Sequence, residues 1–147
     1  NTGTSYPIWC FAWDVECDHN NSGAILLDRG EGFYLNGSWI GSALAGNGIT
    51  VASSFRGEVF IGAGTRIMGN AQHGILVNAG PIDVMIQGAF VGDNSVSSAG
   101  SYHGITFGAN ASGFSVVGNR AGNLVGVGGN NQGYGIFVSS GSSTDYK

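Results

Sequence analysis

Short apolar runs, each centred on an isoleucine, recur along the whole chain. They occupy residues 23–27, 47–51, 73–77, 103–107 and 134–138. Their anchor isoleucines are separated by 24, 26, 30 and 31 residues and are Ile25, Ile49, Ile75, Ile105 and Ile136. This interval matches one coil of a solenoid. The interval lengthens along the chain, which favours coils made of strands and loops, because a coil of short strands can absorb extra residues while the strands stay stacked.

Two further short apolar runs follow most of the anchors. The first set lies at 33–35, 59–61, 84–86 and 115–117, and the second at 39–40, 67–68, 90–91 and 124–125. A glycine follows each run closely, as expected where the backbone must bend sharply or take a positive φ. Three strands and three corners per coil predict an all-β fold, a parallel β-helix of about four to five coils over residues 23–147.

Residues 1–22 follow a different pattern. Apolar and polar residues alternate from Trp9 to Cys17, a period of two that is typical of a half-buried strand. We expect this segment to be a capping strand whose apolar face covers the open end of the first coil. At the other end the chain stops 11 residues after Ile136. We therefore expect the last coil to be incomplete, either continued in a longer protein or covered by a partner subunit.

Composition agrees with a folded chain that binds neither nucleic acid nor membrane. With 42% hydrophobic and 10% charged residues, the 147-residue chain has more apolar content than a disordered glycine-rich linker. The net charge is −4 and the five Lys and Arg residues are scattered, whereas binding to phosphates needs clustered cations. No apolar run approaches the roughly 20 residues that span a bilayer.

Neither the cysteines nor any known motif in the sequence indicates a bound cofactor. Cys10 and Cys17 cannot form a disulfide along one extended strand, which rises about 3.3 Å per residue. Reduced thiols would suit assembly in a reducing cytosol. His19 could join them around zinc, but the usual CxxC pair is missing and no fourth ligand is evident. Phosphate-loop, HExxH and GxSxG motifs are absent as well.

One pair of carboxylates occupies equivalent positions in neighbouring coils. Glu58 directly precedes the run 59–61, and Asp83 directly precedes the run 84–86. Equivalent residues of adjacent rungs lie about 4.8 Å apart, so the two carboxylates would repel and could share a proton, as a general acid requires. This spacing resembles the short carboxylate separation of retaining glycosidases. Alternatively, both lie at exposed corners where water screens the repulsion.

A second acidic set is Asp14, Glu16 and Asp18, which would share one face of the N-terminal strand at intervals of about 6.6 Å. That separation suits an inverting acid and base pair or an oxygen site for a divalent cation. The outer face of an amphipathic strand would also carry these residues without any function.

The histidines follow the repeat. His73 and His103 directly precede the Gly-Ile anchors of their coils, where Asn47 and Tyr134 stand in neighbouring coils. We interpret them as stacked corner residues rather than as catalytic groups.

Asparagines and aromatic residues complete the candidate set. We expect a polar ladder, with amides bonded from rung to rung, from Asn70, Asn94 and Asn119. Exposed aromatic rings could stack on sugars. The candidates for this are Tyr34, Tyr102 and Tyr134, together with Trp39, for which core packing is an equal alternative.

The stretch 47–147, with its His-Gly-Ile-Leu-Val, Phe-Val-Gly-Asp-Asn and Gly-Tyr-Gly-Ile-Phe-Val segments, resembles the right-handed parallel β-helix of bacteriophage tailspikes and tail fibres, in the pectate-lyase-like group. The resemblance implies a homotrimer in the virion tail that is made in the host cytoplasm and recognises host-surface polysaccharide. Many members cleave that polysaccharide with paired acidic residues. In this chain only Glu58 and Asp83 match such a pair.

Three functional hypotheses follow. The first is a segment of a viral tail spike or fibre that binds a bacterial glycan for host attachment. The second is a polysaccharide hydrolase or lyase of the same fold that uses Glu58 and Asp83. The third is a secreted bacterial adhesin, against which the absence of an N-terminal signal pattern counts mildly.

Overall fold

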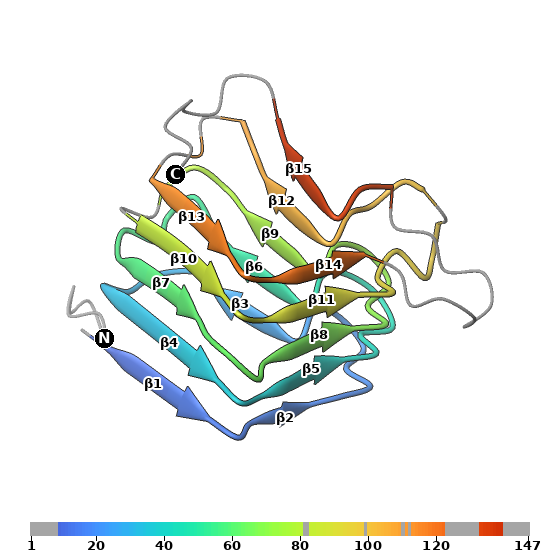
Figure 1. The fold of residues 1–147 in the computed structure, drawn as a ribbon, viewed down its shortest axis with the longest axis horizontal. Helices are drawn as coiled ribbons and strands as arrows, with labels where there is room; N and C mark the ends of the chain where they lie inside the picture. Colours follow the sequence, from blue (N-terminus) through green and yellow to red (C-terminus); the bar gives the residue numbers. More distant parts are fainter. Residues whose placement is uncertain are drawn as a thin grey trace.

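The computed structural model describes residues 9–80, 83–98, 100–109, 111, 113–122 and 133–139, and these form three parallel sheets and no helix. The sheets stack as a β-solenoid of about four turns with three strands in each coil (Figure 1). Sheet A contains β1 (Cys10–Trp13), β4 (Gly32–Asn36), β7 (Glu58–Ile61), β10 (Asp83–Gln87) and β13 (Phe114–Val117). Sheet B contains β2 (Glu16–Cys17), β5 (Trp39–Gly41), β8 (Arg66–Met68), β11 (Phe90–Gly92) and β14 (Arg120–Gly122). Sheet C contains β3 (Ile25–Leu27), β6 (Ile49–Val51), β9 (Ile75–Val77), β12 (Ile105–Phe107) and β15 (Ile136–Val138).

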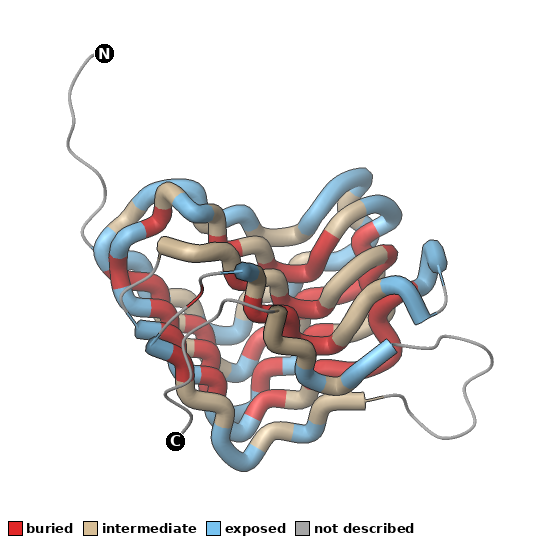
Figure 2. The backbone as a smooth tube through the Cα atoms, turned by 90° about the horizontal axis from the view of Figure 1, so that it is seen from above, coloured by how far each residue is buried: buried red, intermediate tan, exposed pale blue. Residues whose placement is uncertain are grey.

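Sheet C confirms the predicted register of the repeat. Its strands pair in parallel so that the five anchor isoleucines form one continuous stack. The side chains of Ile49, Ile75 and Ile105 are fully buried. Branched and aromatic residues of sheets A and B join the same buried core. Figure 2 shows the buried positions recurring along the backbone from coil to coil.

The corners depend on backbone in the left-handed region. Between sheets A and B, Gly37, Gly88 and Gly118 have φ values of 61°, 68° and 63°. A side chain would be strained at these positions, which explains why glycine follows β4, β10 and β13. Between sheets B and C, Ser42 and Asp93 take φ values of 50° and 51° in the equivalent place. Short polar residues tolerate this conformation better than bulky ones.

The N-terminal segment differs from the prediction of a single strand. Asp14 has a φ of 52° and makes a corner, so β1 and β2 are two strands. They pair with β4 in sheet A and β5 in sheet B. The prediction that the apolar face of this segment is buried is also wrong, because exposed hydrophobic residues on β1 and just before it include Trp9, Phe11 and Trp13.

Two predicted runs of the fourth coil were misplaced. Phe114, rather than Ser115, aligns with Val84 in sheet A. The third strand is β14, where Ala121 aligns with Val91. The predicted run at 124–125 lies outside the described residues. Small residues in β14 gave no apolar signal, so the sequence pattern pointed to the next hydrophobic pair.

The asparagine ladder is confirmed for two of its three members. The amide Nδ2 of Asn70 donates to Oδ1 of Asn94 over 2.8 Å, and both side chains are fully buried. Asn119 instead lies at the corner between sheets A and B. There its Oδ1 accepts from the backbone N–H of Ala89 at 2.8 Å, and its Nδ2 donates to the carbonyl of Ile86.

Truncating one anchor should weaken the whole stack. Ile75→Ala is expected to lower the free energy of unfolding by about 2–5 kcal/mol, because it leaves a cavity between the isoleucines above and below it. Urea unfolding followed by circular dichroism measures this. The control is Leu26→Ala, since Leu26 is 66% exposed in the same sheet. Equal losses in both variants would contradict the assignment of the isoleucine stack as the core.

Candidate functional site

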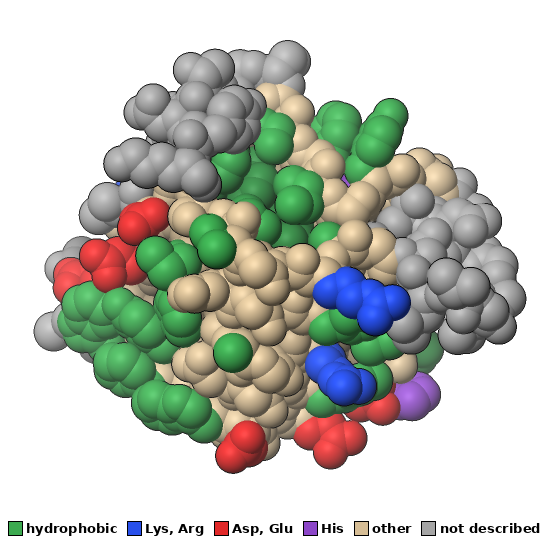
Figure 3. All heavy atoms as spheres, in the orientation of Figure 1, with side chains coloured by type: hydrophobic (Ala, Val, Ile, Leu, Met, Phe, Trp, Pro, Cys, Tyr) green, Lys and Arg blue, Asp and Glu red, His purple; other side chains and the backbone are tan. Residues whose placement is uncertain are grey.

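The outer face of sheet A carries a row of aromatic rings that crosses three rungs. Strand alternation points Phe33, Leu35, Val59 and Ile61 into the core and leaves the residues between them outside. The ring of Phe11 lies 5.7 Å from Trp13 and 5.0 Å from Tyr34, and Tyr34 lies 5.9 Å from Phe60. Hydrophobic side chains gather on this face over β1, β4 and β7 (Figure 3). Phe11 and Trp13 are more than half exposed.

The two predicted carboxylates come together beside this row. In the pairing of β7 with β10, Glu58 aligns directly with Asp83, as the repeat predicted. The hydroxyl of Tyr34 donates a hydrogen bond of 3.0 Å to Oε2 of Glu58. This bond to the carboxylate raises the pKa of the Tyr34 phenol. A small hollow of about 180 Å³ lies among these groups and is lined by Tyr34, Glu58, Val59, Phe60, Asp83 and Met85.

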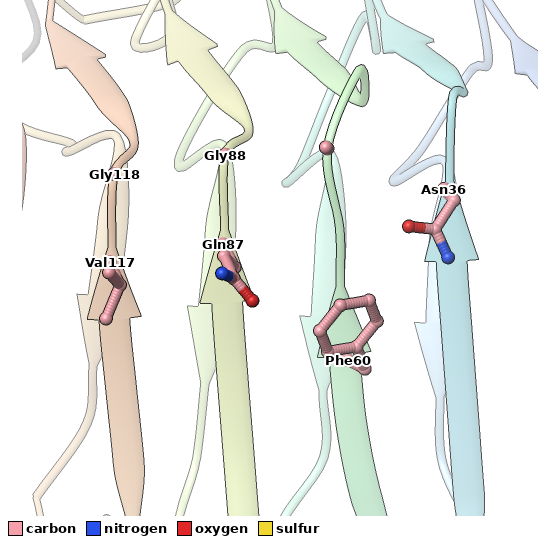
Figure 4. Close-up of a pocket in the computed structure, with 7 residues that line it drawn as sticks. Asn36, Phe60, Gln87, Gly88, Val117 and Gly118 are labelled. Carbon is pink, nitrogen blue, oxygen red and sulfur yellow. The ribbon is translucent and has the colours of Figure 1, made fainter.

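A larger groove continues toward the other ends of the same strands. Its volume is about 430 Å³, and Phe60 lines both the groove and the carboxylate hollow. The amide side chains of Asn36 and Gln87 line it together with Gly88, Val117 and Gly118 (Figure 4). The glycines at the bends carry no side chains, which leaves this end of the face open. The face therefore offers carboxylates at one end, amides at the other and aromatic surface beside them.

Sequence reasoning missed most of this face. It identified Glu58, Asp83 and Tyr34, but assigned no role to Phe60 or Gln87. The signal was present, since Phe60 stands between Val59 and Ile61 and alternation turns it outward.

The second predicted acidic set does not share one face. Asp14 lies at the corner, Glu16 is in β2, and Asp18 follows that strand. Asp18 instead contacts His19, whose Nδ1 lies 2.9 Å from its Oδ2. The prediction of regular spacing along one strand is wrong because the chain turns between the first two residues.

The corner before sheet C contains a ladder of side-chain acceptors. The Oδ1 of Asn47 accepts from the backbone N–H of His73, and the Nδ1 of His73 accepts from the backbone N–H of His103 at 3.0 Å. His103 repeats this contact with the backbone N–H of Tyr134 at 3.2 Å. The structure therefore confirms the interpretation of both histidines as stacked corner residues. Burial, together with the charge of His103, lowers the pKa of His73 to about 4.

The three predicted sugar-stacking tyrosines lie at separate places. Tyr34 is on sheet A, whereas Tyr102 and Tyr134 precede strands of sheet C. Tyr102 packs edge-on against His73 at 5.1 Å, and Tyr134 stacks on Phe137 at 5.8 Å. Their role in glycan binding stays a prediction, and of the three only Tyr34 lines the carboxylate hollow on sheet A.

Neither a metal centre nor a membrane helix is found in the described residues. No three His, Cys, Asp or Glu side chains there come together as a metal site requires. Cys10 and Cys17 are free thiols. The same part of the chain has no helix with the length and apolar character needed to cross a bilayer.

No protein-family model, no curated protein and no solved structure matches this chain. Function must therefore be argued from the side chains that the solenoid displays.

The histidine ladder makes stability depend on pH. Burial, together with the charge of His103, holds the folded-state pKa of His73 at about 4, below the value of about 6.5 expected when unfolded. The stability that neutral His73 contributes is complete above pH 6.5. It should decline between about pH 6.5 and about pH 4, on the order of 1 kcal/mol after allowance for partial exposure.

His73→Asn should flatten this dependence, because asparagine already fills the equivalent position at Asn47. Urea unfolding at pH 7 and pH 4.5 measures the difference. His19→Asn is the control, since His19 is exposed and outside the ladder. If His73→Asn keeps the full pH dependence of the wild type, the ladder is not its source.

Proposed function

We propose that this chain binds a polysaccharide along the outer face of sheet A and serves as a segment of a viral tail spike or tail fibre. The observation that carries the proposal is the exposed aromatic row, which adjoins a hollow lined by carboxylates and a groove lined by amides. Large aromatic side chains normally lose their water-accessible surface in a core. A contiguous exposed group of them, rimmed by polar residues, is typical of a binding surface.

The chemistry of the face suits a sugar polymer. The apolar face of a sugar ring packs on an aromatic ring, and its hydroxyl groups can donate to carboxylates or exchange hydrogen bonds with amides. Phe60 provides a ring between the carboxylate hollow and the amide groove. Parallel rungs repeat at about 4.8 Å, so an extended ligand can meet similar groups on several rungs.

The remaining parts of the proposal come from the resemblance in the coil repeat. In a virion tail, three such β-helices would associate as a homotrimer and present their glycan-binding faces to the host surface. Tail attachment then requires binding only, and the solenoid serves as a rigid support for the face.

Removing the exposed rings tests the binding face. Phe11→Ala with Trp13→Ala should weaken binding to a recognised capsular or O-antigen polysaccharide roughly tenfold or more, since stacking contacts of about 1 kcal/mol each are lost. Calorimetric titration against a panel of purified polysaccharides measures this.

Leu26→Ala with Leu44→Ala is the matched control, because both leucines are exposed apolar residues outside sheet A. The control should bind as the wild type does. Binding that survives in the aromatic variant, or a wild type that binds nothing on the panel, would refute the proposed face.

The alignment of Glu58 with Asp83 favours a second candidate function, polysaccharide hydrolysis. In that case one carboxylic acid protonates the departing glycosidic oxygen while the other carboxylate attacks the sugar carbon, as the short separation of retaining enzymes permits. Water then hydrolyses the resulting glycosyl ester, with the first residue acting as the base. Tyr34 would hold Glu58 in place through its hydrogen bond.

Two isosteric substitutions separate hydrolysis from binding. If the pair is catalytic, Glu58→Gln and Asp83→Asn should each reduce the release of reducing ends at least a hundredfold while the polysaccharide still binds. Asp28→Asn is the matched control, because it removes an exposed carboxylate that lies outside sheet A, and it should keep the turnover of the wild type. Turnover that persists in both variants would exclude the pair as the catalytic groups.

A further inference from the structure

The outer face of sheet B carries a second row of side chains, separate from the groove on sheet A. Its register aligns Arg66 of β8 with Phe90 of β11, and Phe90 with Arg120 of β14. Aligned residues on adjacent rungs point to the same face, so two guanidinium groups flank one phenyl ring. Both arginines are exposed. Two basic side chains lie one above the other on this part of the surface, and acidic side chains border the lower of them (Figure 3).

These residues surround a shallow hollow. Arg66, Met68, Phe90 and Arg120 line a volume of about 180 Å³. The guanidinium carbon of Arg120 lies 5.4 Å from the centre of the Phe90 ring, a cation–π contact that orients the group. The volume suits one charged substituent and the part of a sugar that carries it, rather than several sugar units.

Neither arginine of this pair forms an ion pair within the described part of the chain, and Glu16 shares the face two rungs from Arg66, beyond Trp39. No carboxylate there lies within 4 Å of Arg66 or Arg120, whereas Arg29 lies 3.6 Å from Asp28. The hollow that contains Arg29 and Arg56 is also lined by Glu31. Arg66 and Arg120 are two rungs apart, about 9.6 Å along the stack, and an anion between them would relieve their repulsion. Arginine also offers paired donors that match a carboxylate or a sulfate.

The hollow lies close to the proposed glycan groove. Gln87 lines the groove and Phe90 lines the hollow, and only Gly88 and Ala89 separate them in the sequence. Three residue steps span at most about 11 Å. A polymer of a few sugar units can therefore reach from the face of sheet A to the face of sheet B.

We propose that Arg66 and Arg120 bind a carboxylate or sulfate group of an acidic polysaccharide, with Phe90 and Met68 against the sugar that carries it. This inference rests on the proposed function, and it names the class of glycan as anionic. The acidic protein, with its net charge of −4, would repel a polyanion elsewhere, so this hollow determines which glycans bind.

Charge-matched variants test the site. Arg66→Gln with Arg120→Gln removes the proposed pair, and Arg29→Gln with Arg56→Gln removes two other arginines, so both double variants have the same net charge. The probes are polygalacturonate for the carboxylate, dextran sulfate for the sulfate, and neutral dextran. The first double variant should lose about tenfold or more in affinity for one of the two polyanions, and the second should stay within about twofold of the wild type. Equal losses in the two would overturn the site, since they indicate long-range charge alone.

The two methionines of the chain distinguish failure of the site from failure of the proposed function. Met85 lines the carboxylate hollow on sheet A, and Met68 lines the hollow on sheet B. Their methyl resonances can be followed by NMR while each probe, and then free galacturonate or sulfate, is added.

A shift of Met68 that vanishes in Arg66→Gln with Arg120→Gln supports the anion site, even if no polymer moves Met85 and the sheet A proposal fails. A shift of Met85 without any shift of Met68 overturns the anion site and leaves glycan binding on sheet A intact. No shift at either methionine overturns the anion site, and binding on sheet A is then decided by the panel of capsular and O-antigen polysaccharides.

Discussion

Parallel hydrogen bonding between successive rungs is the constraint on which the other features of this molecule depend. Each strand pairs with the equivalent strand one coil later, so equivalent residues repeat at about 4.8 Å. A residue that suits one rung must therefore also suit the residue above and below it. Apolar side chains satisfy this requirement easily, and the inward positions of all three sheets form one buried core.

Polar side chains satisfy the same constraint by bonding along the stack. Asn70 and Asn94 can be fully buried because each amide finds a partner on the neighbouring rung. Asn47 and His73 accept the backbone N–H of the next rung, so a corner that would leave donors unpaired is closed by side chains. Ladders of this kind need no function to explain them.

Like charges gain nothing from stacking, which makes their positions informative. Glu58 and Asp83 align directly, and Arg66 and Arg120 are kept apart by one aromatic rung. Both pairs lie on outer faces, where water reduces the repulsion. Each pair also has an aromatic partner in the fold, since Glu58 accepts the hydroxyl of Tyr34 and Arg120 lies over the ring of Phe90.

The sequence predicted those features that repeat from coil to coil. The isoleucine stack, the alignment of Glu58 with Asp83 and the corner position of the histidines all follow from one register. Prediction from the sequence failed where a rung departs from the repeat. The corner at Asp14 interrupts an alternation that looks continuous, and the small residues of β14 carry no apolar signal.

The outer faces could not be read from hydrophobicity, because apolar residues occupy both sides of the strands in sheet A. Val59 and Ile61 fill the core, while Phe60 between them faces outward, and the sequence alone does not distinguish this from a strand buried on both faces. The structure separates the two cases, since Phe11 and Trp13 on the same face stay more than half exposed. Exposed aromatic surface weakens the hydrophobic gain of folding, so its presence beside carboxylates and amides favours recognition as the role of this face.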